Sequence, residues 1–211
     1  MITEQMVADA VRKALAQMNN DNEEIKVGVS QRHIHLSQQD LETLFGKGFE
    51  LTKKKTLMGR EFASDQLVTL VGPSLRAIEG VRVLGPLRKA SQVEISVTDS
   101  YVLKVKPPVR ESGKLQGSAP ITIIGPKGIV QLSEGCIIAN RHIHMSPDDA
   151  AHFGVKDGDY IDVDATTGTK RTRWFDVQVR VHKDFRLEMH VDTDDANAVG
   201  FKNGSTVVPV K

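Results

Sequence analysis

Cysteine is almost absent from this sequence, since Cys136 is the single one among 211 residues. One cysteine excludes a disulfide within the chain, and such usage is typical of a reducing compartment. No apolar run reaches the length of a membrane-spanning helix, and the N-terminus lacks the uninterrupted apolar stretch of a signal peptide. We therefore expect a cytoplasmic protein that does not enter a membrane.

An excess of charge of either sign is also missing, because 28 lysines and arginines offset 27 aspartates and glutamates. No general basic field favours nucleic acid as a partner, and the short basic clusters at 53–55 and 171–173 are more typical of solvated loops. The sequence contains neither a P-loop nor a dinucleotide-binding glycine motif. Its 39% hydrophobic and 26% charged residues describe a globular chain with one large domain or two small ones.

Helical periodicity is scarce beyond residues 3–18, where apolar side chains recur at helical spacing. A polar run at 19–24 follows and resembles a linker. Two interpretations of residues 1–20 stay open. The amphipathic helix folds back onto the domain, or it is a detachable segment whose apolar stripe docks on a partner.

The rest of the chain consists of short strand-like segments. Gly-Pro pairs at 72–73, 85–86 and 125–126 each follow an apolar run and mark turns. This pattern favours a mainly β fold, a barrel or a sandwich, over alternating strands and helices. The expected strands are Ile25–Ser30, Leu67–Val71, Ile78–Leu84, Gln92–Val97, Ile121–Ile124, Ile129–Leu132, Cys136–Ala139, Tyr160–Val163, Phe175–Val181, Arg186–Val191 and Ser205–Val210.

The phrase Arg-His-Ile-His occurs twice, at 32–35 and 141–144, and holds four of the seven histidines. In extended chain, residues two apart point to the same side, so each histidine pair converges. Two imidazoles side by side form a two-point clamp for a metal, and imidazole suits zinc. A single such pair is most often structural, but the second copy in a matched context favours metal binding.

Each phrase continues into a predicted short helix. Ser37 and Ser146 are placed as N-caps with an aspartate three residues on, and Gly46 and Gly154 can end the helices. The repeated unit is therefore a strand, a histidine pair and a capped helical turn.

Further ligands and cations have candidates. Glu94 and His190 each lie on the polar side of a predicted strand, where each is a metal ligand or a plain exposed residue. An arginine fork matches phosphate geometry. The arginines near these motifs are Arg32, Arg88, Arg110 and Arg141.

Three classes of function fit these residues. The first is a metal-assisted transferase or hydrolase, a thioesterase included, that acts on a phosphate- or carbonyl-bearing substrate. The second is a cupin-like oxygenase, which the helical caps after each histidine pair disfavour. The third is a non-catalytic metal-binding module, which the surplus arginines disfavour.

Five segments together resemble the PduL-type phosphate acyltransferases, or phosphotransacylases, of bacterial microcompartments. They read, in order, VGVSQRHIHLS, GPLRKASQVEIS, VRESGKLQGS, IIANRHIHMSPDDA and LEMHVDTDDANA, and the match runs from about Val27 to Gly200. The resemblance implies the reversible conversion of an acyl-CoA, propanoyl-CoA first and acetyl-CoA second, and phosphate into an acyl phosphate and coenzyme A.

The resemblance also implies two zinc ions per chain and a fold of two interleaved β-barrels with short capping helices. One barrel would comprise residues 32–139, and the other residues 25–31 plus 140–211. Residues 1–20 would direct the protein to the shell or cargo of a microcompartment in the bacterial cytoplasm, and the chain would form a homo-oligomer. The implied site residues are His33, His35 and Glu94 for one zinc, His142, His144 and His190 for the other, and Arg88 for phosphate.

Overall fold

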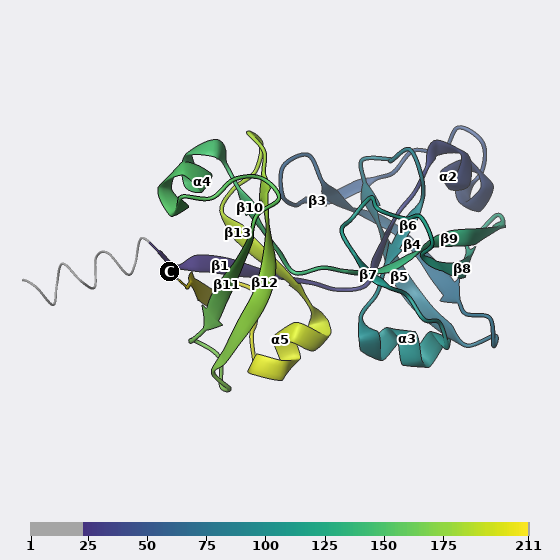
Figure 1. The fold of residues 1–211 in the computed structure, drawn as a ribbon. Helices are drawn as coiled ribbons and strands as arrows, with labels where there is room; N and C mark the ends of the chain where they lie inside the picture. The colour runs from purple at the N-terminus through teal and green to yellow at the C-terminus, as the bar shows by residue number, and fades with distance from the viewer. Residues whose placement is uncertain (1–22, 211) are drawn as a thin grey trace, which may run out of the picture.

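The structure is a computed structural model that describes residues 23–210 (Figure 1). The predicted helix within residues 1–20 lies outside this range. The helices of the described range are α2 (Gln38–Phe45), α3 (Val97–Leu103), α4 (Pro147–Phe153) and α5 (Thr193–Val199). Its strands are β1 (Ile25–Ser30), β2 (His33–His35), β3 (Lys53–Thr56), β4 (Phe62–Val71), β5 (Ala77–Gly85), β6 (Gln92–Glu94), β7 (Val109–Arg110), β8 (Ala119–Ile124), β9 (Ile129–Ala139), β10 (His142–Met145), β11 (Tyr160–Ala165), β12 (Thr172–Val181), β13 (Glu188–Asp192) and β14 (Thr206–Pro209).

Six strands from the middle of the chain close into the first barrel. Their hydrogen-bonded order is β4-β5-β2-β6-β9-β8, and β8 returns to β4. The short strands β3 and β7 extend this sheet at β4 and β9. A second closed barrel has the order β1-β13-β10-β12-β11-β14, so the first strand of the chain joins strands from its C-terminal part. The predicted class, mainly β with two interleaved barrels and short capping helices, is confirmed.

The two barrels repeat one topology. In each, the histidine strand pairs in parallel with one neighbour and antiparallel with the other: β2 with β5 and β6, and β10 with β12 and β13. A short helix follows the histidine strand, α2 or α4, and another follows its antiparallel neighbour, α3 or α5. Figure 1 shows the barrels side by side, with α3 and α5 on one side of the molecule.

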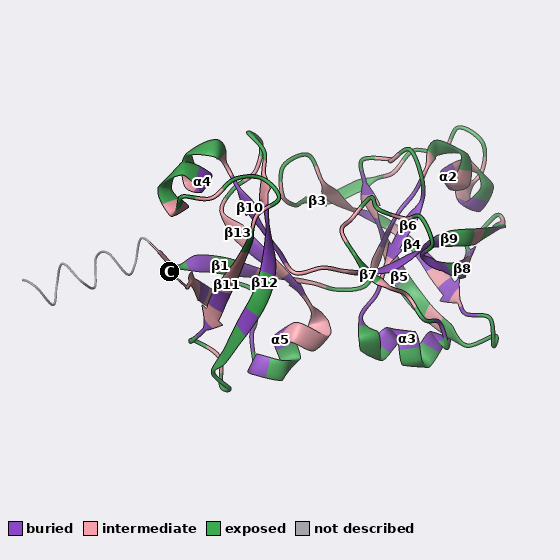
Figure 2. Cartoon of the chain, viewed as in Figure 1, coloured by how far each residue is buried: buried purple, intermediate pink, exposed green. Residues whose placement is uncertain are grey.

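Each barrel has its own apolar core, because alternate residues of every strand point inward. The isoleucines of the two histidine phrases, Ile34 and Ile143, are fully buried, one in each core. Buried residues therefore follow the strands inside both barrels, while the helices are largely exposed on their outer faces (Figure 2). Since the isoleucine between each histidine pair points inward, the histidines lie on the outside of the barrel wall.

Helix caps fix where the chain leaves each strand. The Ser37 side chain accepts a hydrogen bond from the backbone of Asp40, and Ser146 does the same for Asp149, as predicted. Ser96 and Asp192 cap α3 and α5 in the same way.

Some predicted elements are wrong in extent. The sequence predicts a strand over Gln92–Val97, but β6 ends at Glu94 and Val97 begins α3, because Ser96 and Asp99 form a capping box. It also predicts two strands at Ile129–Leu132 and Cys136–Ala139. One continuous strand, β9, covers both segments. Gly135 lies between them with a positive φ of 142°, a conformation that glycine adopts easily and that lets the strand continue.

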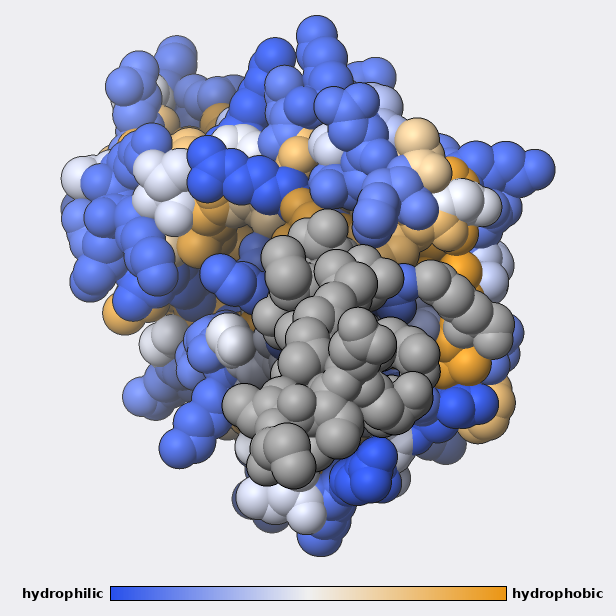
Figure 3. Space-filling model, turned by 90° about the vertical axis from the view of Figure 1, so that its left-hand side faces the viewer, coloured by the Kyte–Doolittle hydropathy of each residue, from blue (hydrophilic) through white to orange (hydrophobic). Residues whose placement is uncertain are grey.

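No helix of the described range is long and apolar enough to cross a membrane. The outer end of the second barrel is largely hydrophilic, with separate hydrophobic patches (Figure 3).

Candidate metal and anion site

The first candidate metal group lies on β2 and β6 of the first barrel. The antiparallel register places His33 opposite Glu94, so the two side chains lie on the same face of the wall. His33 Nε2 is 3.5 Å from Glu94 Oε2. One ligand atom from each of His33, His35 and Glu94 lies within 4.8 Å of the other two. These distances suit one shared ion.

The second group occupies the equivalent place on β10 and β13. His142 lies opposite His190 in the register, as His33 lies opposite Glu94. Ligand atoms of His142, His144 and His190 also lie within 4.8 Å of one another. Glu188, two residues before His190, extends toward the same ring at 3.5 Å.

Backbone carbonyls orient the first histidine of each pair. His33 Nδ1 donates to the carbonyl of Gln31 at 2.8 Å, and His142 Nδ1 donates to the carbonyl of Asn140 at the same distance. Because a carbonyl oxygen only accepts, Nδ1 carries the hydrogen and Nε2 keeps a free lone pair. A carbonyl at this position is the usual support of a metal-binding histidine.

Three histidines of the site, His35, His142 and His144, are held neutral. Burial, then the charges of His33 and Arg88, lowers the pKa of His35 to about 2. Burial, then His190 and Arg180, lowers the pKa of His144 to about 3, and burial first also holds the pKa of His142 well below 6.5. The buried Nδ1 atoms of His35 and His144 have no hydrogen-bond partner. Neutral imidazoles with unsatisfied nitrogens fit metal ligands.

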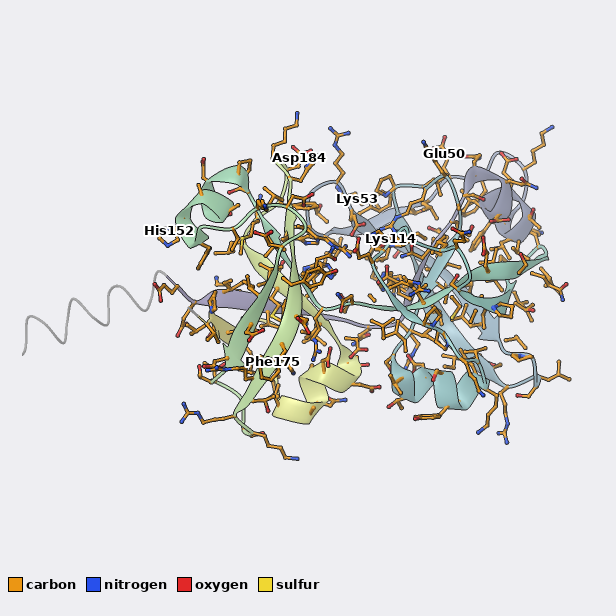
Figure 4. The ribbon with its side chains drawn as sticks, viewed as in Figure 1. Glu50, Lys53, Lys114, His152, Phe175 and Asp184 are labelled. Carbon is orange, nitrogen blue, oxygen red and sulfur yellow. The ribbon has the colours of Figure 1, made fainter. Side chains whose placement is uncertain are left out.

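A pocket at the junction of the barrels joins the two groups. Equivalent segments of both barrels line it, so it is built from pseudo-symmetric halves: Ser30–His33 and Glu94–Ser96 face Ala139–Asn140, His142 and His190–Asp192. The barrels also contact each other beside it. The backbone N–H of Thr98 at the start of α3 donates to Asp194 of α5 at 2.7 Å. Elsewhere Arg60 reaches Asp184 at 3.6 Å, where Figure 4 shows Asp184 close to the junction.

Arg88 lies beside the first group and takes part in a polar network. Its guanidinium donates to Glu61 at 2.7 Å and to Ser112 Oγ at 2.8 Å. Ser112 in turn donates to Glu94 at 3.1 Å and accepts from Gln92 at 2.8 Å. The arginine is thereby tied through one hydroxyl to a candidate metal ligand.

The other arginines considered from the sequence have different surroundings. Arg32 is paired with Asp99 at 2.7 Å and Arg141 with Asp195 at 3.4 Å, so both connect a histidine strand to the helix of its neighbour. Arg110 is exposed on β7.

Sequence reasoning missed Ser112, Gln178 and Arg180. Gln178 and Arg180 lie opposite His142 and His144 on the parallel neighbour β12. The alternation of β12, with Val177 and Val179 in the core, is visible in the sequence. The pairing of β12 with β10 is a long-range contact that the alternation does not reveal.

Comparisons with known proteins agree with this site. The family model described as phosphate propanoyltransferase matches residues 26–202. The phosphate propanoyltransferase of Lachnoclostridium phytofermentans is 59% identical over 87% of this chain and 85% of its own length. Those of Thermotoga maritima and Rhodobacter capsulatus are 50% and 44% identical, over 89% and 98% of this chain and 89% and 95% of their own lengths. The chain therefore belongs to the phosphate propanoyltransferase family, a family of acyltransferases.

Proposed function

We propose that this chain catalyses the reversible reaction of an acyl-CoA, propanoyl-CoA first, with phosphate to give an acyl phosphate and coenzyme A. Acetyl-CoA is the second candidate substrate. The observation that carries the proposal is the pair of three-residue ligand groups, which occupy equivalent places on two barrels and each contribute two residues to the lining of one pocket. Family membership over residues 26–202 supports the reaction and the substrates.

We further propose that both ligand groups hold zinc. Five of the six candidate ligands are histidines, and neutral imidazole with one carboxylate suits this ion. The unsatisfied Nδ1 atoms and the carbonyl-anchored rings support such binding. When bound, zinc supplies Lewis acidity toward a thioester carbonyl and toward a thiolate leaving group.

Arg88 binds the phosphate in this proposal. Its fork presents donors in the geometry of two phosphate oxygens. Phosphate has to replace Glu61, whose carboxylate accepts from Arg88 in this structure. Positioning the phosphate beside the thioester gives it the advantage over water as the attacking nucleophile.

The first test is release of free thiol from propanoyl-CoA on addition of phosphate, before and after a chelator strips the metal. We expect release that needs phosphate, disappears on stripping and returns with zinc. Release without phosphate would identify a thioesterase. No release by zinc-loaded protein, with acetyl-CoA also tried, would favour a non-catalytic metal-binding module.

Replacing Arg88 with alanine tests its role. We expect the KM for phosphate to rise at least about tenfold, or turnover to be lost, because the phosphate loses a charge-assisted fork. Steady-state kinetics at saturating propanoyl-CoA measures this. Unchanged phosphate kinetics would contradict the assignment.

The proposed cellular setting is the bacterial cytoplasm, inside a microcompartment. Residues 1–20 would associate with the shell or with other cargo, and the chain would form a homo-oligomer, a dimer or larger. These proposals rest on the resemblance to the microcompartment acyltransferases and on the amphipathic pattern of the N-terminal residues.

A further inference from the structure

Arg180 lies on β12, immediately beside the second histidine group. The parallel register sets Arg180 opposite His144 and Gln178 opposite His142. Val177 and Val179 are fully buried in the barrel core. Because neighbours along a strand alternate, Gln178 and Arg180 point out of the barrel with the histidines.

Among the described residues, the guanidinium of Arg180 has no counter-ion. Its Nε donates to Gln178 Oε1 at 3.3 Å, while its Nη2 is buried and has no hydrogen-bond partner. No carboxylate of residues 23–210 lies within ion-pair distance of it. A buried charge without a partner is costly, so the fold tolerates Arg180 at the expense of stability.

Other partly buried arginines differ in this respect. Arg32, Arg88 and Arg141 each have a carboxylate within 3.4 Å. Arg82, which lies on the strand of the first barrel equivalent to β12, donates to the carbonyl of Ser64 at 2.6 Å. In the register, Arg82 corresponds to Gln178, and Leu84 corresponds to Arg180, so the first barrel has no arginine at the place of Arg180. An unpaired guanidinium beside the second histidine group therefore points to an anion that comes from outside the chain.

Charges from both barrels act on Arg180. Glu94 and Glu111 of the first barrel stabilise its charge, and Arg88 opposes it. Arg180 in turn lowers the pKa of both His142 and His144. Arginine remains protonated at neutral pH even when burial lowers its pKa. One permanent cation thus lies beside the second ligand group, within electrostatic reach of Arg88.

We propose that Arg180 is a second anion-binding residue. It binds the attacking phosphate from the second barrel, while Arg88 binds the same phosphate from the first barrel. This inference rests on the proposed function. Two guanidinium groups on separate barrels match a dianion with three terminal oxygens.

The reaction balances with these groups. An oxygen of hydrogen phosphate forms a bond to the thioester carbonyl carbon, and the carbon–sulfur bond breaks with its electron pair on sulfur. The proton of hydrogen phosphate ends on that sulfur as the thiol of coenzyme A. No oxidant or reductant takes part. Arg180 and Arg88 hold the phosphoryl oxygens that do not react, and both stay protonated throughout.

The test compares Arg180→Gln and Arg180→Lys with Arg173→Lys. Arg173 is the matched control, since it lies on the same strand in an exposed pair with Asp164. We expect Arg180→Gln to raise the KM for phosphate at least about tenfold and to change the KM for propanoyl-CoA less than about twofold, because a charge-assisted fork is lost. Arg180→Lys keeps the charge without the fork and should fall between. The control should match the wild type.

A binding experiment separates this inference from the proposed function. Calorimetry with inorganic phosphate on zinc-loaded protein, without any CoA, needs no turnover. Weaker phosphate binding in Arg180→Gln, at an unchanged zinc content, supports the assignment even if the wild type released no thiol. Equal binding by the variant and the wild type overturns it.

Two further outcomes would also overturn the assignment. A rise in the KM for propanoyl-CoA alone would mean that Arg180 contacts the phosphates of coenzyme A. Loss of zinc or of thermal stability in both the Gln and the Lys variants, with unchanged phosphate affinity in the folded fraction, would make Arg180 a structural residue.

Discussion

At the scale of residues, the candidate site consists of ordinary side chains whose surroundings favour the neutral, oriented state that a metal ligand needs. His33 and His142 are fixed by carbonyls, and His35 and His144 are kept neutral by burial. The sequence predicts these four histidines because their spacing converges them locally. Glu94 and His190 are brought in by strand pairing, and their assignment as ligands came from the resemblance.

Replacing His190 with alanine should remove one ion and leave the other. The second group loses a ligand, while His33, His35 and Glu94 remain intact on the other barrel. We expect zinc content to fall from about two to about one per chain and thiol release to fall about 100-fold or more. Metal analysis and the phosphate-dependent assay measure both.

His152→Ala is the control for this variant, since His152 is exposed on α4. It should retain both ions and full activity. If the His190 variant also retained both ions, the second group would not be a metal site.

Asp195 should make stability depend on pH. Burial first, then Asp192 and Asp194 against the opposing charge of Arg141, raises its pKa to about 6. The folded protein therefore holds a proton that the unfolded chain releases near pH 4. The contribution of this proton to the free energy of unfolding falls as pH rises from about 4 to about 6. Above about pH 6 it does not change further.

The variant Asp195→Asn cannot gain or lose that proton. The free energy of unfolding of the variant, minus that of the wild type, should increase as pH rises from about 4 to about 6 and should then stay constant. Urea unfolding of both proteins, freed of metal, measures the difference at each pH. A difference that does not change with pH would show that Asp195 does not titrate in this range.

At the scale of elements, short capped helices fix the directions in which strands enter and leave the site. The caps at Ser37 and Ser146 are predictable because a serine, an aspartate three residues on and a closing glycine are local signals. Helices α3 and α5 are harder to predict, because each lacks one of these three signals: α3 ends at Lys104 instead of a glycine, and Asp192 takes the place of the serine before α5.

Replacing Ser146 with alanine should cost about 1 kcal/mol of folding free energy, because the first turn of α4 loses its cap. For a chain of this size the Tm should fall about 2–4 °C. The KM values should not change, because α4 follows the histidine strand without lining the pocket. Denaturant unfolding and steady-state kinetics check the two expectations.

Asp148→Asn is the matched control for the lost cap. Asp148 lies in the first turn of the same helix, outside the cap's own hydrogen bonds. A loss as large as that of Ser146→Ala would mean that charge in the first turn, rather than the cap, stabilises α4.

At the scale of the whole molecule, the site belongs to neither barrel alone. Each barrel supplies one ligand group, and the pocket has walls from both. Local motifs predict the halves, but their juxtaposition depends on how two closed barrels pack, which no local pattern encodes. Arg180 and Ser112 are invisible for the same reason. The division into residues 32–139 and residues 25–31 plus 140–211 stays a proposal.

Deleting residues 1–20 should separate location from catalysis. Both ligand groups and the described pocket lining lie within residues 30–192, so we expect thiol release by the shortened protein to match that of the full chain. Its association with microcompartment shells should be lost. Co-purification of tagged full-length and shortened proteins with shells measures this. Retention of the shortened protein would favour a helix that packs on its own domain.

The place of β1 has a consequence for synthesis on the ribosome. Ile25 pairs with Val207, and Val27 pairs with Met189. The first strand therefore cannot pair until β13 and β14, near the end of the chain, have been translated. The barrel made from the middle of the chain can close earlier, because its strands are complete by Ala139. A nascent chain that has not reached His190 therefore carries only one complete ligand group, and the second barrel cannot close before β14 is synthesised.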